Sequence, residues 1–193
     1  LKDGAEASFE GIHKNGRPIN GVRRYCDGRT YVGDVKSFKP HGTGVMSLPN
    51  GERHYGEWQL GVRSGHGGSS FPDGSWYRGY YKDHMYSGNG ALYDATQGTM
   101  YEGEFVHGMK SGQGTFAWDD GETYTGGFLD DKMHGHGCAT YKDGLVYTGQ
   151  FFENDCRGKG TFVWKNGDWY KGMVRNNVAH GTGSRSVASG RAL

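Results

Sequence analysis

Aromatic or small residues alternate with polar ones in short stretches of the chain, and this alternation returns at a nearly constant interval. In "TMYEGEFVHGMKSGQGTFAW", Tyr101, Gly103 and Phe105 fall on one side of a two-residue period, and Glu102 and Glu104 fall on the other. A period of two is typical of a β-strand with one buried face. The pattern therefore predicts strands that have an aromatic face and a polar face.

Eight copies of this pattern follow one another along the chain. Successive copies begin 22 to 24 residues apart, at Phe9, Tyr31, His54, Tyr77, Tyr101, Tyr124, Tyr147 and Tyr170. Each start is followed two residues later by a glycine, namely Gly11, Gly33, Gly56, Gly79, Gly103, Gly126, Gly149 or Gly172. Such a period indicates an array of supersecondary units. One array is predicted over residues 1–183, with residues 184–193 as a C-terminal cap or tail.

Asp-Gly or Asn-Gly separates most copies, as at Asn50-Gly51 and Asp120-Gly121. These dipeptides favour two-residue type I′ hairpin turns. We therefore expect each copy to turn tightly into the next, and the longer link inside a copy, such as Val106 to Ser111, to form the loop at the opposite edge. The predicted fold class is all-β: an elongated, open antiparallel meander of tandem hairpins that forms a single-layer twisted sheet.

Glycine is abundant, at 37 of 193 residues, and aromatic residues make up 14% of the chain. Glycine in a strand packs no side chain. Here the repeated glycines share a face with the rings, which leaves room for a ring to lie flat over the backbone. Gly33, Gly56, Gly79, Gly103, Gly126, Gly149 and Gly172 are therefore predicted to be structural glycines, and valine at Gly103 or Gly126 should clash with a ring.

The net charge is +1, which argues against general attraction to nucleic acid. Charge is nevertheless segregated: residues 41–156 contain 7 Lys/Arg and 15 Asp/Glu, and residues 157–193 contain 7 and 1. The basic end, which includes Lys159 and Lys171, is a candidate for contact with an acidic partner or anionic lipid. Cys26, Cys138 and Cys156 are odd in number and widely spaced, which favours a reducing, cytoplasmic location.

The pattern Tyr-x-Gly-x-Phe followed by Gly-x-Gly, as in "YEGEFVHGMKSGQGTFAWDDGET", resembles the MORN (membrane occupation and recognition nexus) repeat family, over residues 9 to about 183. The resemblance implies an all-β ribbon, often dimeric, that acts as a non-catalytic scaffold without a cofactor. Relatives occur in cytoskeletal and cell-division scaffolds, in cilia and flagella, at membrane junctions and as accessory domains of enzymes. We therefore expect a protein-interaction module associated with the cytoskeleton or a cilium. The alternatives are a peripheral module for anionic phospholipid and an accessory repeat domain of a larger protein.

The aromatic face is the first candidate site, as a groove for an amphipathic helix or an extended peptide. The residues expected to line it are Tyr101, Phe105, Phe116, Trp118, Tyr124, Phe128, Tyr141, Tyr147, Phe151, Phe162, Trp164 and Tyr170. The alternative is that these rings pack only on glycines and on each other. On the reverse face, Tyr55, Trp76 and Tyr80 stand where most copies have polar residues, and they are a candidate patch for a partner or a homodimer.

A metal site and a catalytic site receive little support. In "MHGHGC", His134, His136 and Cys138 share a strand face and are possible zinc ligands. However, three side chains on one straight strand reach a common ion poorly, and His134 occupies an ordinary position of the repeat. None of the hydrolase, zinc-protease or phosphate-loop motifs is present in the sequence. The sequence therefore predicts neither a metal centre nor an enzyme.

Overall fold

The computed structural model describes residues 6–187, and every regular element within them is a β-strand. The chain divides into two compact units, residues 1–96 and 97–193. The first contains β1 (Glu6–Lys14), β2 (Arg17–Tyr25), β3 (Thr30–Lys36), β4 (Lys39–Ser47), β5 (Arg53–Gln59), β6 (Val62–Ser70), β7 (Trp76–Lys82) and β8 (Met85–Asp94). The second contains β9 (Thr99–Val106), β10 (Met109–Ala117), β11 (Thr123–Leu129), β12 (Lys132–Thr140), β13 (Val146–Phe152), β14 (Asp155–Val163), β15 (Trp169–Arg175) and β16 (Val178–Ser186).

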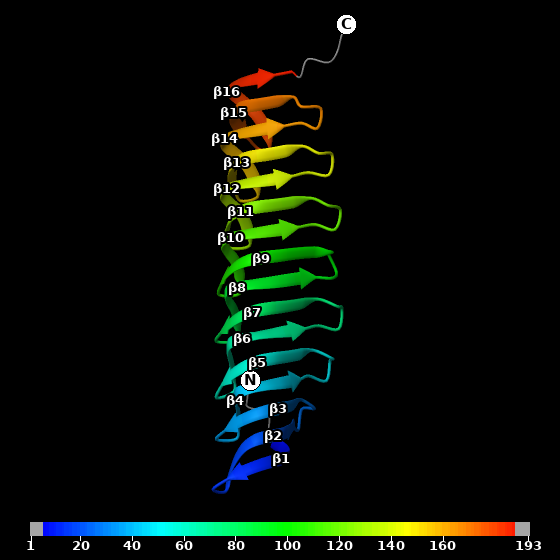
Figure 1. Cartoon of the computed structure of the whole chain (residues 1–193), viewed down its shortest axis with the longest axis vertical. Coiled ribbons are helices and arrows are strands. Elements are labelled where there is room, and N and C mark those ends of the chain that lie inside the picture. The colour runs from blue at the N-terminus through cyan, green and yellow to red at the C-terminus, as the bar shows by residue number, and fades with distance from the viewer. Residues whose placement is uncertain (1–5, 188–193) are drawn as a thin grey trace. The chain divides into compact units, whose positions relative to one another are not determined.

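Within each unit, every strand pairs antiparallel with the strand that follows it in the sequence (Figure 1). The predicted all-β class and the open hairpin meander are thus confirmed. Each of the eight predicted starts lies in the first strand of a hairpin. Strand β16 runs to Ser186, so the predicted C-terminal tail begins as strand, and residues 188–193 lie outside the described residues. Residues 6–187 contain no helix with the length and apolarity that crossing a membrane requires.

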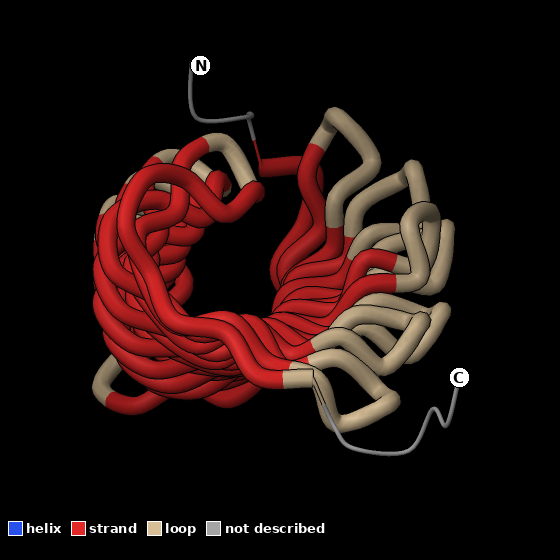
Figure 2. The backbone as a smooth tube through the Cα atoms, turned by 90° about the horizontal axis from the view of Figure 1, so that it is seen from above, coloured by secondary structure: helices blue, strands red, loops and turns tan. Residues whose placement is uncertain are grey.

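The pairing register slips beside the glycines inside every hairpin, and β1–β2 has a second slip between Glu6 and Ser8. In the β11–β12 hairpin, Gly126 pairs with Gly137 but Phe128 pairs with Met133, so β12 carries two extra residues at this point. Gly135, inside the slip, has φ of 79°, a left-handed conformation that glycine adopts without strain. Bulges of this kind bend a strand and increase its twist. Seen end-on, the strands are accordingly curved (Figure 2).

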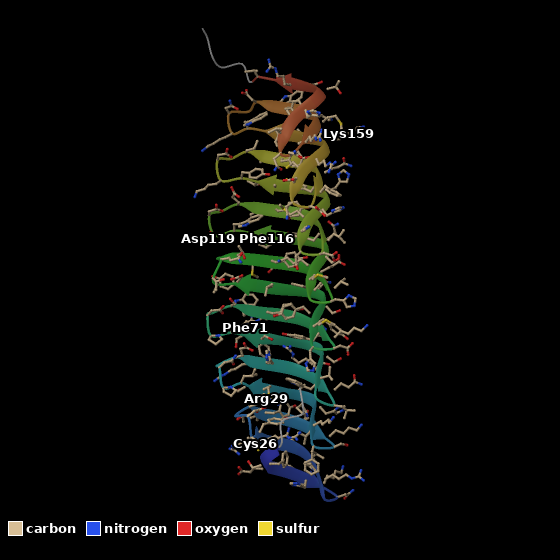
Figure 3. All side chains as sticks on the ribbon, turned by 180° about the vertical axis from the view of Figure 1, so that it is seen from behind. Cys26, Arg29, Phe71, Phe116, Asp119 and Lys159 are labelled. Atoms are coloured by element: carbon tan, nitrogen blue, oxygen red, sulfur yellow. The ribbon has the colours of Figure 1, made fainter. Side chains whose placement is uncertain are left out.

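The two kinds of turn are opposite to the sequence-based prediction. The tight type I′ turns lie inside the copies, because both central residues there have positive φ, as at Asp130 (48°) and Asp131 (67°). At Asn50-Gly51 only Gly51 has positive φ, and its N–H donates to the carbonyl of Leu48 at 3.0 Å. That geometry is a type I turn followed by a left-handed glycine, the usual three-residue hairpin loop. Figure 3 shows Arg29, Phe71 and Asp119 in the connections of this second kind.

The tyrosine that starts a copy lies over a pair of glycines on adjacent strands. In the β11–β12 hairpin, a Cβ atom added to Gly126 would lie 2.5 Å from the Gly137 Cα and 2.6 Å from the Tyr124 hydroxyl. The hydroxyl donates to the carbonyl of Gly127 at 2.8 Å, three residues further along the strand. Tyr31, Tyr77, Tyr101, Tyr147 and Tyr170 make the same bond, at 2.8 to 2.9 Å. In these copies the tyrosine ring or its hydroxyl thus lies where a Cβ on the paired glycines would stand.

The rings form the core without a second layer of structure. Tyr124 contacts Phe128 of its own copy and Phe151 of the next edge-to-face, with centroids 5.2 and 4.8 Å apart. Edge-to-face packing at this separation is favourable for aromatic rings. Tyr124 is fully buried, and burial raises the pKa of its hydroxyl to about 12. The aromatic face of the sheet is thus its interior.

Replacing Gly126 with valine should destabilise the protein by about 3 kcal/mol or more, because the new side chain collides with backbone as well as with a ring. A matched control is Gly135→Ala. Gly135 has open space around its Cβ direction, so alanine there should cost only the roughly 1–2 kcal/mol of a left-handed residue. Chemical denaturation of both variants measures the difference. Equal losses of stability would show that steric exclusion at the paired glycines is not the controlling factor.

Candidate functional site

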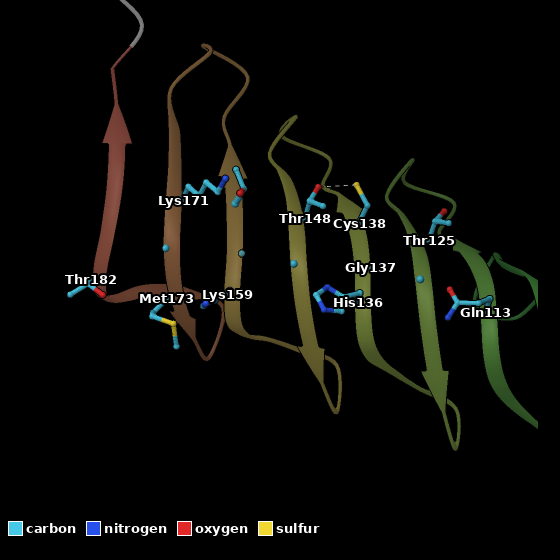
Figure 4. A pocket seen from close by; sticks show the side chains of 15 residues that line it. Gln113, Thr125, His136, Gly137, Cys138, Thr148, Lys159, Lys171, Met173 and Thr182 are labelled. Carbon is cyan, nitrogen blue, oxygen red and sulfur yellow. Dashed lines mark hydrogen bonds between the residues drawn. The ribbon is translucent and has the colours of Figure 1, made fainter.

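A groove of about 730 Å³ crosses the second unit on the face opposite the tyrosine rings (Figure 4). It extends from Gln113 on β10 to Thr182 on β16. Its floor is backbone, since Gly126, Gly137, Gly149, Gly160 and Gly172 pair in one row across β11–β15. The rings occupy the other side of this row, so the groove face of the glycines stays open.

Two rows of side chains flank the glycine floor. The first, in strand order, is Thr125, Cys138, Thr148, Thr161 and Lys171, each paired with the next. The second contains Gln113, His136, Lys159, Met173 and Thr182. Within the first row the Thr148 hydroxyl donates to the Cys138 thiol sulfur at 3.5 Å. The lining therefore offers hydroxyl, amide and ammonium groups, and none of its residues is Asp or Glu.

The predicted aromatic groove divides into a buried part and an accessible part. Tyr101, Phe105, Tyr124, Phe128, Tyr147, Phe151 and Phe162 are buried. Phe116, Trp118, Tyr141 and Tyr170 are half-buried, and Trp164 is 41% exposed. The buried rings are packed against one another. The prediction that rings of this face contact a partner is therefore kept for the accessible rings alone. The sequence reasoning missed the threonine row on the opposite face, although its period-two signal was present.

The proposed reverse-face patch lies in the first unit. Tyr55 and Tyr80 are 40% and 39% exposed, and Trp76 is half-buried beside Tyr93 with centroids 6.2 Å apart. Tyr80 contacts the ring of His66 edge-to-face at 5.4 Å. Four successive cross-strand partners in this unit, Val22, Val32, Val45 and Tyr55, are apolar or aromatic. The first unit thus carries an apolar row where the second carries threonines.

The three possible zinc ligands do not converge. His134 packs against the ring of Phe152 at 5.2 Å, whereas His136 and Cys138 line the groove. Within residues 6–187, no group of three or more His, Cys, Asp or Glu side chains is placed to hold a metal ion. His134 is accounted for by its packing.

A partly buried polar cluster surrounds His54, which replaces the tyrosine of the third copy. His54 Nδ1 lies 2.8 Å from Ser69 Oγ and 3.1 Å from Arg63 Nη1, and Ser69 Oγ lies 2.6 Å from Tyr81 Oη. Since a guanidinium only donates, Nδ1 is the acceptor and the proton of the neutral ring is on Nε2, 3.8 Å from Glu52. Serine, histidine and glutamate are the components of a hydrolytic triad. However, Ser69 is only 1% exposed and its oxygen is shared with Tyr81, so we interpret the cluster as polar core.

Comparison with known protein families finds a repeat family with the same period as the copies described above. The family described as MORN repeat matches residues 31–53, 54–76, 101–123, 124–146, 147–169 and 170–190. These are six of the eight copies; those that start at Phe9 and Tyr77 are outside the match, yet they form hairpins β1–β2 and β7–β8.

Among characterised proteins, the chain is similar to Alsin of Rattus norvegicus and of Homo sapiens, with 34% identity over 98 residues. That segment is 48% of this chain and 6% of Alsin. Among solved structures, the chain resembles the TCP domain of Drosophila melanogaster SAS-4 (TM-score 0.45, 11% identity, 76% of this chain and 84% of that one). It also resembles the TCP10 domain of Danio rerio CPAP (0.44, 14%, 83% and 79%). Both TM-scores are below 0.5, so these two likenesses carry no functional conclusion.

Acidification should destabilise the first unit through His54. Burial, and then the positive charge of Arg63, lower the pKa of His54 to about 4 from the ordinary 6.5. Between pH 6.5 and about pH 4, His54 is therefore protonated in the unfolded chain and neutral in the folded chain. The free energy of unfolding falls as the pH drops through this window. By pH 5 the loss should be on the order of 2 kcal/mol.

The measurement is denaturant unfolding at pH 7, 6 and 5, for wild type and for His54→Gln, which keeps a hydrogen-bonding side chain without the titration. Wild type should lose more stability than the variant over this range. His84 also has a pKa lowered by burial and by Arg63, so a smaller slope should persist in the variant. Identical slopes would show that His54 is not excluded from protonation in the folded protein.

Proposed function

Because this chain belongs to the MORN repeat family, we propose that it is a non-catalytic protein-interaction module that holds an extended segment of a partner in the groove of its second unit. The observation that carries the proposal is the groove itself: an open glycine floor between two rows of hydrogen-bonding side chains. Glycine there lets a partner approach the backbone closely. The chemistry of the lining suits recognition of polar and charged groups.

The dimensions of the groove support a linear ligand. It crosses seven strands, β10 to β16, and strands spaced at ~4.8 Å make this a span of roughly 29 Å. An extended chain rises ~3.3 Å per residue, so about nine residues cover it. A repeated surface of this kind provides serial contact positions, which suits attachment within a larger assembly. We propose that this assembly belongs to the cytoskeleton or to a cilium.

A second surface is the apolar patch of Tyr55, Trp76 and Tyr80 in the first unit, together with Val32 and Val45. Its exposed aromatic and aliphatic side chains favour association with another protein or with a second copy of the chain. The two surfaces differ in chemistry, since one is apolar and the other is polar and basic. They therefore support two contacts of different kinds.

The groove is tested with the double variant Thr148→Glu/Thr161→Glu, which adds charge beside the floor. Leu129→Glu/Val106→Glu is the matched control, because both residues are exposed and lie outside the groove lining. Quantitative affinity capture from cells, with thermal unfolding recorded in parallel, should show a specific protein lost only from the groove variant while both variants remain folded. Retention of that protein by the groove variant, or capture of anionic vesicles alone, would contradict the proposal.

The apolar patch is tested with Trp76→Glu/Tyr80→Glu. Charges there should abolish one association, seen as the loss of a dimer by light scattering or of a specific captured protein. The folded state should persist, because both residues lie on the face opposite the buried Tyr77 and Tyr81. Unchanged mass and unchanged partners would remove this surface from the proposal.

A further inference from the structure

We propose that the groove of the second unit binds an extended acidic peptide, whose carboxylates are received by the bulges at His136 and Thr182 and by the ammonium groups of Lys159 and Lys171. This inference rests on the proposed function and specifies its ligand.

Three other copies show what these bulges bind, because each of the three holds one of the chain's own carboxylates. The residue between the two glycines of Gly-x-Gly donates its backbone N–H to a carboxylate on the preceding strand. His66 N donates to Glu57 Oε1 at 3.1 Å, and Gln113 N donates to Glu104 Oε1 at 2.9 Å. Thr43 N donates in the same way to Asp34 Oδ2 at 3.1 Å. A carboxylate is therefore a fitting acceptor at this backbone position.

The last three copies, like those that start at Phe9 and Tyr77, have no carboxylate cap at this position, and the last three supply every residue of the groove lining except Gln113. The residue in the place of Glu57 and Glu104 is Gly127, Gln150 or Met173. Gln150 still accepts the bulge N–H with a neutral oxygen, since its side-chain Oε1 accepts a hydrogen bond from the backbone N–H of Lys159 at 3.1 Å. Gly127 and Met173 have no side-chain oxygen to offer to His136 and Thr182. Both of those residues line the groove.

Positive charge replaces the missing carboxylates. Lys159 is the cross-strand partner of Met173, and Lys171 is the cross-strand partner of Thr161. Both lysines line the groove, neither has an ion-pair partner among residues 6–187, and the lining contains no Asp or Glu (Figure 4). The groove thus has ammonium groups beside the row of positions that Asp34, Glu57 and Glu104 occupy in three other copies. An acidic segment complements this surface in charge and in hydrogen bonding.

The spacing of the bulges specifies the ligand further. His136 is on β12 and Thr182 is on β16, four strands apart, which is roughly 19 Å at ~4.8 Å per strand. An extended peptide covers that distance in about six residues at ~3.3 Å each. Two residues separated by an even number also point to the same side of an extended chain. The expected ligand therefore carries Asp or Glu at two positions about six residues apart.

The probe is a fluorescein-labelled dodecapeptide of serine and threonine, blocked at both ends, with Glu at positions 3 and 9. Fluorescence anisotropy with the full chain, at low salt and up to 1 mM protein, should give saturable binding. The same peptide with Gln at both positions should bind at least tenfold more weakly. A peptide with Glu at positions 3 and 6 should lose part of that advantage. Absence of saturable binding, or equal binding of the Glu and Gln peptides, would overturn the proposal.

The decisive variant is Met173→Glu, which supplies the missing cap and places a carboxylate beside Lys159. It should weaken binding of the Glu peptide at least tenfold while thermal stability stays the same or rises. Met173→Gln restores a neutral cap, as Gln150 does, and should weaken binding less. Met109→Glu adds the same charge on an exposed residue of β10 outside the lining and should leave binding unchanged.

Each contrary result has a distinct meaning. If Met109→Glu weakens binding as much as Met173→Glu, net charge is responsible and the site is wrong. If Met173→Glu loses stability in proportion to binding, the loss of binding is a folding effect and the cap assignment fails. If the cellular partner is lost from Thr148→Glu/Thr161→Glu but retained by Met173→Glu, the groove function stands and the acidic ligand does not.

Discussion

The structure depends on one contact, the tyrosine ring that lies over two paired glycines and donates its hydroxyl to the carbonyl three residues ahead. A Cβ on either glycine would collide with the ring or with the facing strand. The hydroxyl satisfies a carbonyl beside the bulge, where the regular ladder is interrupted. An unsatisfied buried carbonyl would cost about 1–3 kcal/mol, which explains why tyrosine and not phenylalanine fills most copies. The rings of successive copies thereby pack on one another and form a core on one face of the sheet, with no second layer of helices or strands within residues 6–187.

This arrangement confines the packed rings to one face of the sheet. The aromatic face is consumed by packing, so the opposite face is free to vary between copies. In the first unit that face carries Val32, Val45 and Tyr55, and in the second it carries threonines with Lys159 and Lys171. Because each copy contacts mainly its neighbours, the side chains of the free face can differ between copies at little cost to the fold.

The third copy shows how far the repeated contact can be altered. His54 cannot make the tyrosine's hydrogen bond, and Arg63, Ser69 and Tyr81 close a network around it instead. Buried polar groups are tolerated when all of them are bonded. The pKa of His54 is lowered in the folded protein, so the stability of this unit depends on pH. The copies with tyrosine at this position do not have this dependence.

The sequence by itself determined the strands and the copies, because a period of two and a period of about 23 residues are local properties that each copy repeats. It also placed Tyr55 and Tyr80 on the face opposite the core. Only the tertiary structure decided which turn is tight, because the type I′ geometry depends on φ at residues such as Asp130 and Asp131 that carry no glycine signal. It likewise decided that the groove lies on the glycine floor of the opposite face and that most of the repeated rings are buried. Those outcomes depend on how rings from successive copies fill the space between bent strands, which no single copy specifies.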